Sequence, residues 1–419
     1  MVSVCFYFQV HQPFRVRRYS VFDIGERNDY FSDNSDSNLN NEKIIRKVSE
    51  KCYLPANKLM LELIKRYPKF KISYSLSGVL LEQLEKFAPS VLDSFKALSD
   101  TGNVEFLNET SHHSLSFIFS KEEFRNQVEL HRKKIKSLFG QTPKVFRNTE
   151  LIYNNDLAKE ISDLGFKATL LEGADHVLGW RSPNFVYSPK NSPSLKLLLK
   201  NYRLSDDIAF RFSEKSWEGW PLTAPKFASW VNAINGDGNT VNLFMDYETF
   251  GEHQWESTGI FEFLRALPEE ILKHPDNDFK TPSEVIESYP SVGEIDVHNF
   301  MSWADIERDL SAWLGNPMQN SAISSLYKLK DDILKSGDED LIELWRKLQT
   351  SDHFYYMCTK WFADGDVHKY FNPYESPYDA FISFMNVLHD MRLRVADLKK
   401  ASLQNVYKSG GIKITGEEE

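Results

Sequence analysis

The sequence predicts an α/β fold in which a seven-stranded β/α barrel precedes a helical region. Short apolar runs alternate with longer helical or irregular segments from residue 2 to residue 246, which is the pattern of β/α units around a parallel sheet. No Gly-rich dinucleotide-binding motif follows any of these runs, so a barrel is favoured over an open doubly wound sheet. The predicted strands are 2–10, 70–77, 104–109, 144–149, 167–172, 194–199 and 240–246.

Helices are predicted between the strands and after them. Apolar residues recur at helical spacing over 42–66 and, more weakly, over 121–139, and a short helix is expected at 156–164. Beyond the last strand, residues 338–357 and 375–398 each carry an apolar stripe on one helical face. The second half of the chain is therefore expected to be mainly helical.

A change of composition divides the chain into two expected domains. Residues 275–292 are rich in Pro, Asp, Asn and Ser, which is typical of a boundary. We expect a catalytic barrel over residues 1–275 and a C-terminal helical region over residues 276–410. The polar stretch 25–41 is expected to be a loop.

The composition narrows the classes of ligand and compartment. A formal net charge of -10 disfavours a nucleic acid, because binding a phosphate backbone needs clustered Lys and Arg. The start of the chain lacks the features of a signal peptide, no apolar stretch reaches the length of a membrane span, and the cysteines form no CxxC pair. We expect a cytoplasmic protein that binds neither nucleic acid nor membrane. Its oligomeric state does not follow from the sequence.

Ionisable and polar side chains follow five of the predicted strands. In β/α barrels the ends of the strands meet at one face, where the reactive groups of such enzymes lie. Five strand ends of this kind on one face predict a catalytic cleft. These groups are His11 and Gln12 after the first strand, Glu109, His112 and His113 after the third, Arg147 and Glu150 after the fourth, Glu172 after the fifth, and Asp246, Glu248 and His253 after the seventh.

Two of these carboxyl groups have surroundings that favour opposite protonation states. Cleavage of a glycosidic bond needs one ionised and one protonated carboxyl group. Asp246 follows an apolar strand end that can raise its pKa by desolvation, whereas Glu150 lies beside Arg147, which favours a carboxylate. This asymmetry predicts Glu150 as nucleophile and Asp246 as general acid/base.

Three stretches of the sequence resemble motifs of glycoside hydrolase family 57. They are His-Gln-Pro at 11–13, Phe-Arg-Asn-Thr-Glu-Leu-Ile-Tyr at 146–153, and Phe-Met-Asp-Tyr-Glu-Thr-Phe-Gly-Glu-His-Gln at 244–254. The resemblance runs from residue 2 to about residue 358 and is greatest to α-amylase-like members. The family also includes 4-α-glucanotransferases, branching enzymes and α-galactosidases.

This resemblance implies a fold, a reaction and a set of site residues. The fold is an irregular TIM-like (β/α)₇ barrel, with a C-terminal helical region that packs on it and completes the cleft. The reaction is a retaining double displacement on α-1,4-glucans or maltooligosaccharides, without metal or other cofactor. By motif position Glu150 matches the nucleophile, Asp246 the acid/base and His11 a residue of the subsite for the cleaved ring. The last motif resembles residues 348–355 and implies cleft positions for Asp352 and His353.

Further substrate contacts are expected from histidines, carboxylates and aromatic rings. Adjacent residues on a strand or turn point in different directions, so one of His112 and His113 is expected to line the cleft. Sugar rings stack on exposed aromatic side chains, for which Trp220 is a candidate, whereas Trp303 stays undecided. The expected substrate-binding residues are His11, Gln12, His112, Arg147, Glu172, Trp220, Glu248, His253, Asp352 and His353.

Three alternatives remain at this stage. A 4-α-glucanotransferase or branching enzyme would use the same residues but pass the sugar to a hydroxyl group. A metal-dependent polysaccharide deacetylase would need an Asp and two His as ligands, and no HxxxH motif occurs. A glucan-binding protein without activity would be expected to lack one of the two carboxylates.

Overall fold

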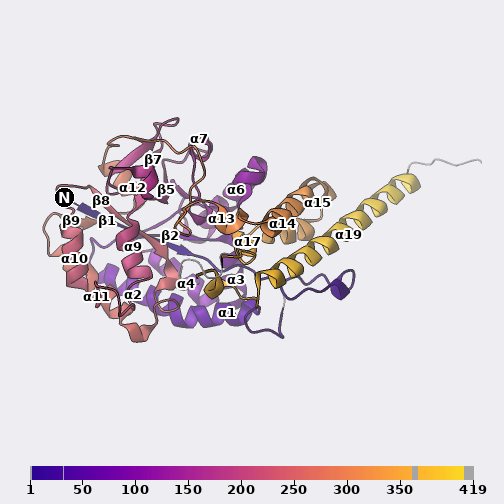
Figure 1. Ribbon diagram of the computed structural model, residues 1–419, viewed down its shortest axis with the longest axis horizontal. Helices are drawn as coiled ribbons and strands as arrows, with labels where there is room; N and C mark the ends of the chain where they lie inside the picture. The colour runs from indigo at the N-terminus through magenta and orange to yellow at the C-terminus, as the bar shows by residue number, and fades with distance from the viewer. Residues whose placement is uncertain (1, 32, 361–366, 410–419) are drawn as a thin grey trace, which may run out of the picture. The chain divides into compact units, whose positions relative to one another are not determined.

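The computed structural model describes residues 2–31, 33–360 and 367–409 of the 419-residue chain (Figure 1). The chain forms two compact units. The first comprises residues 1–14 and 41–312, and the second comprises residues 15–40 and the described residues from 313 onward. This division differs from the expected one at residue 275, because the first unit continues through β9 (Asn277–Phe279), α12 (Pro282–Ser288) and β10 (Glu294–Ile295). Residues 15–40, in turn, belong to the helical unit.

The seven predicted strands are all present in the first unit. β1, β2, β3 and β8 form a parallel sheet in the order β3-β2-β1-β8, in which β9 also pairs with β1. A second sheet has the order β10-β6-β7-β5-β4, and only its β6–β7 pair is antiparallel. The strands are β1 (Val2–Val10), β2 (Ile72–Leu76), β3 (Val104–Phe106), β4 (Val145–Arg147), β5 (Ala168–Glu172), β6 (Val186–Pro189), β7 (Lys196–Lys200), β8 (Thr240–Asp246), β9 (Asn277–Phe279) and β10 (Glu294–Ile295).

Backbone hydrogen bonds join the two sheets at both edges. Asn108, just after β3, donates its N–H to the carbonyl of Val145 at 3.0 Å and accepts the N–H of Arg147 at 2.8 Å. Asn201, just after β7, donates its N–H to the carbonyl of Asn242 on β8 at 2.9 Å. The predicted strands therefore follow one another as β1-β2-β3-β4-β5-β7-β8 in an irregular barrel. The predicted α/β barrel fold is confirmed, and β6, β9 and β10 are additions to it.

Helices of the first unit cover the outer faces of these strands (Figure 1). The predicted helix 42–66 is present as a continuous helical stretch with a π turn, and the predicted helices 121–139 and 156–164 are confirmed as α6 and α7. The helices are α1 (Asn41–Val48), α2 (Leu54–Arg66), α3 (Gly78–Phe87), α4 (Pro89–Ser99), α5 (Ser116–Phe119), α6 (Lys121–Phe139), α7 (Asn155–Asp163), α8 (Asp175–Leu178), α9 (Tyr202–Ala209), α10 (Ala224–Asn232), α11 (Ile260–Leu272) and α12 (Pro282–Ser288).

The second unit is helical. The predicted helix 338–357 is two helices, α16 and α17, and the stripe predicted at 375–398 lies in the longer α19. Within this unit the predicted loop is tied to α19, because the Asp390 carboxylate accepts hydrogen bonds from the Gly25 N–H at 2.6 Å and the Tyr30 hydroxyl. From α13, at the unit boundary, the helices are α13 (Ser311–Leu314), α14 (Pro317–Lys328), α15 (Lys330–Ser336), α16 (Glu339–Lys347), α17 (Ser351–Tyr355), α18 (Val367–Phe371) and α19 (Pro377–Ser409).

The alternation of side chains along the strands divides the barrel into layers. In β1 every residue is buried: Val4, Phe6 and Phe8 pack in the core beneath the outer helices, and Cys5 and Tyr7 pack in a separate apolar cluster with residues of β4, β5, β7 and β8. Successive residues of a strand point to opposite faces, so residues two positions beyond this inner cluster also face inward. These next positions are polar, and they form the site described below.

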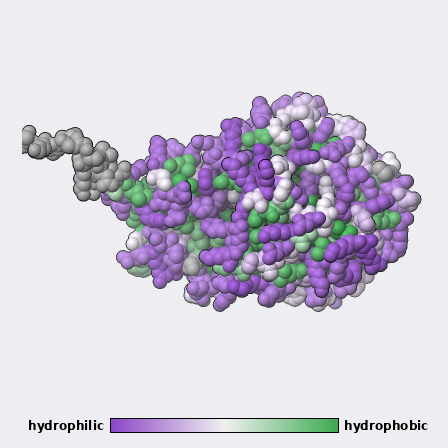
Figure 2. Space-filling model, turned by 180° about the vertical axis from the view of Figure 1, so that it is seen from behind, coloured by the Kyte–Doolittle hydropathy of each residue, from purple (hydrophilic) through white to green (hydrophobic). Residues whose placement is uncertain are grey.

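The surface is mainly hydrophilic on the face drawn in Figure 2. No described helix combines the length and apolar character that crossing a membrane requires. The cysteines at 5, 52 and 358 are buried free thiols.

Candidate active site

Inward-facing polar side chains form a layer at the carboxyl ends of the barrel strands. Each lies two positions beyond an apolar residue of the inner cluster, as Arg147 follows Val145, Glu172 follows Leu170, Lys200 follows Leu198 and Asp246 follows Phe244. On the other side of the barrel, the Tyr7 hydroxyl donates to Gln9 Oε1 at 2.7 Å, and Gln9 Nε2 donates to Glu109 at 3.0 Å. The barrel therefore carries a layer of polar side chains directly beyond the apolar inner cluster.

Glu150 follows β4 on a short 3₁₀ turn, Thr149–Leu151. Its backbone is left-handed, with φ 58° and ψ 24°, and the same holds for Leu151 with φ 50°. A left-handed conformation costs a non-glycine residue about 1–2 kcal/mol. Its side chain is 18% exposed, and its Oε2 accepts a hydrogen bond from the indole N–H of Trp303 at 2.8 Å. The turn thus presents the Glu150 carboxylate in a fixed and accessible position.

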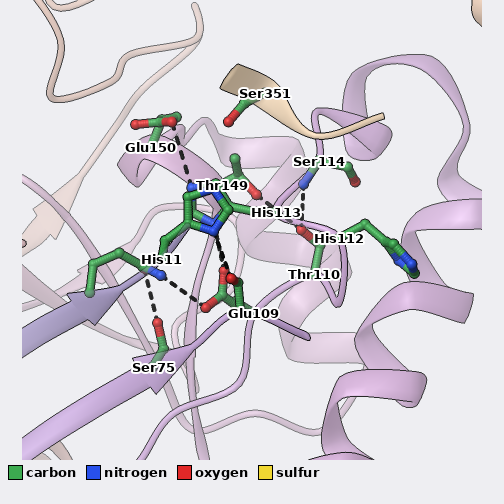
Figure 3. A network of polar contacts seen from close by, with 12 residues as sticks. His11, Ser75, Glu109, Thr110, His112, His113, Ser114, Thr149, Glu150 and Ser351 are labelled. Atoms are coloured by element: carbon green, nitrogen blue, oxygen red, sulfur yellow. Dashed lines mark hydrogen bonds and ion pairs between the residues drawn. The ribbon is translucent and has the colours of Figure 1, made fainter. Parts of the chain in front are cut away.

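His113 faces the other oxygen of Glu150. Its Nε2 lies 3.6 Å from Glu150 Oε1, and its Nδ1 lies 2.7 Å from Glu109 Oε2 (Figure 3). Burial lowers the pKa of His113, but the charges and hydrogen bonds of Glu109 and Glu150 raise it to about 9. Burial likewise opposes ionisation of Glu109, yet His113 brings the pKa of this carboxyl down to about 2. At neutral pH the pair is therefore an imidazolium and a carboxylate beside Glu150.

His11 completes this part of the site. Its ring stacks on that of His113, with ring centres 4.0 Å apart and an interplanar angle of 21°. Its Nδ1 lies 2.6 Å from the Ser77 hydroxyl, and its backbone N–H donates to Glu248 Oε1 at 3.3 Å. The structure therefore brings together His11, His113, Glu150 and Glu248, which follow four different strands.

Asp246 ends β8 and is half-buried. Desolvation and the negative charge of Glu150 raise its pKa to about 6, against the opposing effect of Arg147. Glu248, on the following turn, is buried, and desolvation together with the charge of Asp246 raises its pKa to about 8. A pKa of about 6 leaves a protonated fraction of Asp246 near neutral pH, and the half-buried residue remains partly accessible.

Arg147 is fully buried at the end of β4. Its guanidinium carbon lies 4.8 Å from the centre of the Trp303 ring. None of its side-chain nitrogens has a hydrogen-bond partner among the residues that the structure describes. Its positive charge lowers the pKa values of Glu109 and Asp246, so it acts on carboxyl groups that follow two different strands.

Glu172 belongs to a buried ion cluster. Its Oε2 lies 3.5 Å from Lys200 Nζ and 3.7 Å from Arg308 Nη1, and its Oε1 accepts the N–H of Gly173 at 2.8 Å. Asp206 joins the same cluster, with Lys200 Nζ at 3.0 Å and Arg308 Nη2 at 3.9 Å. Glu172 was expected to contact substrate. The structure instead gives its carboxylate two cationic partners, because a fully buried carboxylate needs compensation.

The remaining barrel residues that were predicted to bind substrate are His112, Gln12, His253 and Trp220. His112 is turned away from Glu150 (Figure 3), so of the two neighbouring histidines it is His113 that lies beside this carboxylate. The backbone N–H of His112 faces Gln127 Oε1 at 3.4 Å. Gln12 accepts a hydrogen bond from Gln83 through its carbonyl at 2.8 Å. Burial lowers the pKa of His253 to about 4, which leaves its imidazole neutral. Trp220 is 43% exposed.

Asp352 and His353 lie in the second unit. His353 is buried, with Nε2 3.1 Å from the carbonyl oxygen of Lys347 and its ring packed against Phe31 and Phe384. These contacts make His353 part of the core of its own unit. Asp352 is half-buried, and its charge adds to burial in raising the pKa of Tyr356.

Two contacts were not predicted from the sequence: the ion pair of Glu109 with His113, and the hydrogen bond from Trp303 to Glu150. Glu109 and His113 are four residues apart, a spacing that places them together on one turn, and this signal was available in the sequence. Trp303 gave no such signal, because it lies 153 residues beyond Glu150 along the chain.

Comparisons with known proteins agree with the geometry. The family model described as Glycosyl hydrolase family 57 matches residues 5–298. A protein of Methanocaldococcus jannaschii named "Putative alpha-amylase" is 46% identical over 407 residues, covering 94% of this chain and 85% of that protein. Alpha-amylase 1 of Dictyoglomus thermophilum is 28% identical over 230 residues, and the match covers 54% of this chain but 33% of the longer relative.

A solved structure has the same fold. A GH57-type branching enzyme from Pyrococcus horikoshii superposes with a TM-score of 0.67 at 14% sequence identity, over 99% of this chain and 92% of that chain. The chain therefore belongs to glycosyl hydrolase family 57 and is a glycoside hydrolase.

Proposed function

We propose that the chain is a retaining glycosidase that cleaves α-1,4-glucans, with Glu150 as nucleophile and Asp246 as general acid/base. The observation that carries the proposal is that two carboxyl groups, one just after β4 and one at the end of β8, stand in surroundings of opposite effect on ionisation. Burial and the charge of Glu150 raise the pKa of Asp246 to about 6, whereas Glu150 is surrounded by the Trp303 N–H and the charged His113. This is the division of roles that a double displacement requires.

The first chemical step would form a glycosyl-enzyme. Glu150 attacks the anomeric carbon while Asp246 gives its proton to the departing glycosidic oxygen, so that one C–O bond forms as the other breaks. Asp246 is then a carboxylate. In the second step it takes a proton from water, which attacks the anomeric carbon and releases Glu150.

Two neighbouring features would maintain suitable charges around Glu150 and Asp246 during the reaction. The Glu109–His113 ion pair holds a positive charge beside Glu150 throughout the cycle. Glu248, whose pKa is raised to about 8, is mostly protonated at neutral pH and so adds little negative charge next to Asp246. We propose that His11, stacked on His113, contacts the sugar ring at the cleavage point.

Substitution of the two carboxyl groups tests the proposal. Glu150→Gln and Asp246→Asn should each lower kcat on maltooligosaccharides by at least about 10³-fold, the scale of nucleophilic and acid/base contributions. Glu62→Gln is the control, since this exposed residue of α2 pairs with Arg265 on the surface. Azide should restore turnover of an activated glycoside by Glu150→Ala and give a glycosyl azide of inverted configuration. Wild-type rates in Glu150→Gln and Asp246→Asn would refute the assignment and leave a binding protein or another reaction class.

The choice between water and a sugar as acceptor needs a product analysis. The M. jannaschii and D. thermophilum relatives are named as amylases, whereas relatives from Thermococcus and Pyrococcus include a 4-alpha-glucanotransferase and a branching enzyme. We propose hydrolysis, in line with the relative that matches 94% of this chain. Maltotriose should give only glucose and maltose, while a ladder of longer products would indicate transfer.

The proposed reaction uses no metal or other cofactor. Incubation with a chelator should leave activity unchanged, and loss of activity that Zn²⁺ restores would favour the deacetylase alternative. We also place the protein in the cytoplasm, a reducing compartment, because Cys5, Cys52 and Cys358 are free thiols.

A further inference from the structure

We propose that Trp303 is a positioning residue for the nucleophile: its indole N–H holds one oxygen of the Glu150 carboxylate, so that the other oxygen is presented to the sugar. This inference rests on the proposed role of Glu150 and assigns a function to a residue that lies outside the sequence motifs. The distance from Trp303 Nε1 to Glu150 Oε2 is 2.8 Å. The backbone N–H of Trp303 also donates to the carbonyl of Glu150 at 3.2 Å.

Two hydrogen bonds from one residue fix both the backbone and the side chain of Glu150. The terminal torsion of a glutamate is broad, so a carboxylate without such a donor samples many orientations. Here Oε2 is occupied by the indole N–H, whereas Oε1 faces His113 Nε2 at the longer distance of 3.6 Å. The geometry therefore distinguishes the two oxygens: Oε2 accepts the indole N–H, and Oε1 lies on the side of His113.

The loop that carries Trp303 is built to hold the ring in place. It starts with an antiparallel bridge beside the nucleophile, in which Met301 and Tyr153 exchange backbone hydrogen bonds of 2.9 and 3.0 Å. It returns at Arg308, whose carbonyl accepts the Ser302 N–H at 3.0 Å and whose Nη1 donates to the Trp303 carbonyl. The loop is therefore closed on itself on both sides of Trp303.

Arg308 also ties this loop to the barrel. Its guanidinium lies 3.7 Å from Glu172 Oε2 and 3.9 Å from Asp206 Oδ2, both in the buried ion cluster. Asp305 and Arg308 have left-handed backbones, with φ of 56° and 52°. Such strained residues persist where the surrounding structure determines the conformation. The ion cluster thus explains why Glu172 is buried: it anchors the loop that orients the nucleophile.

The face of the indole has partners of its own. The Arg147 guanidinium carbon lies 4.8 Å and Lys200 Nζ 5.5 Å from the ring centre. Cations are attracted to the negative face of an aromatic ring, so the two buried charges hold the ring while its N–H edge faces Glu150. A phenylalanine would keep an aromatic face for these cations, and it would lose the N–H donor together with part of the ring volume.

The donor has a use in both chemical steps. When Oε1 bonds to the anomeric carbon, Oε2 becomes the carbonyl oxygen of the resulting ester, and it can keep the same hydrogen bond from Trp303. No proton is transferred to or from the indole. Trp303 would therefore act on the rate of the chemical steps and hardly at all on the binding of substrate.

Trp303→Phe separates this role from a structural one. We expect kcat to fall about 10- to 100-fold, the loss from removing one donor to a charged group, with KM changed less than about threefold. The control is Trp230→Phe, a partly buried tryptophan that packs on the outer core, which should change kcat by less than about twofold. Unchanged kcat, or a raised KM at constant kcat, would overturn the proposal.

A second variant shows whether Trp303 acts through Glu150. Glu150→Asp withdraws the carboxylate by one methylene from the indole N–H, so Trp303→Phe should cost less than about threefold in this background. An equal loss in both backgrounds would overturn the positioning role and leave the role of Glu150 intact. If Glu150→Asp and Glu150→Gln keep the wild-type kcat, Glu150 is not the nucleophile. The proposed function is then refuted independently of the result for Trp303→Phe.

Discussion

Replacing Glu109 by glutamine removes the carboxylate that keeps His113 protonated, and it should change how stability depends on pH. Nδ1 of the buried His113 lies 2.7 Å from Glu109 Oε2. Burial alone lowers the pKa of a histidine, and it is Glu109, with help from Glu150, that raises the pKa of His113 from 6.5 to about 9. Without the Glu109 charge, burial should dominate and His113 should be neutral at pH 7.

The size and direction of the effect follow from proton linkage. A rise from 6.5 to about 9 corresponds to about 3 kcal/mol of stability, at about 1.4 kcal/mol per pKa unit. Because the folded-state pKa is raised, this stability is fully present below pH 6.5 and is lost as the pH rises through 9. The pH-dependent part of the difference between wild type and Glu109→Gln should therefore be about 3 kcal/mol at pH 6 and near zero at pH 10.

Urea titration of the barrel unit at several pH values measures this difference. Groups that titrate alike in both proteins cancel when the two free energies of unfolding are subtracted. Glu42→Gln is the control, since it removes a carboxylate from an exposed pair with Arg46 on α1 and should give a small difference with no trend between pH 6 and pH 10. A Glu109→Gln effect that is constant with pH, or that grows toward pH 10, would refute the charged pair.

Two further predictions concern packing and buried charge in the barrel unit. Lys200→Met should destabilise the unit by about 3–5 kcal/mol in urea titrations at pH 7, because Glu172 and Asp206 lose their shared buried cation. Gly251→Ala should cost about 2–4 kcal/mol in the same assay, because its φ is +113° and an added Cβ would lie 2.0 Å from the Lys51 carbonyl oxygen.

Each of these variants has a matched control. Lys196→Met changes the first lysine of the same strand, which is half-buried, and should cost less than about 0.5 kcal/mol. Gly102→Ala introduces a Cβ at a φ of +74° with open space around it, so it should cost only the backbone strain of about 1–2 kcal/mol. If Lys200→Met and Lys196→Met lost equal free energy of unfolding, the explanation by a shared buried cation would be contradicted. Equal losses in Gly251→Ala and Gly102→Ala would contradict the explanation by a steric clash.

The sequence by itself determined the barrel strands and the face on which the site lies. A strand covered on both faces must be apolar along its length, and β1 is buried at every position. Where such a strand ends, polar side chains can reach solvent or substrate, so the positions of Glu150 and Asp246 at strand ends were predictable from the local pattern. The same reasoning correctly assigned a raised pKa to Asp246, because the apolar run before it is visible in the sequence.

Only the tertiary structure decided which polar residues meet. Whether His112 or His113 faces Glu150 depends on a turn in which His113 has a φ of 49°, and neighbouring histidines have no pattern that distinguishes them. The partners of Glu172 come from β7 and from the loop near residue 308, and Trp303 reaches Glu150 across 153 residues. Local sequence specifies the strands through burial, but contacts between distant segments depend on how loops are closed and held.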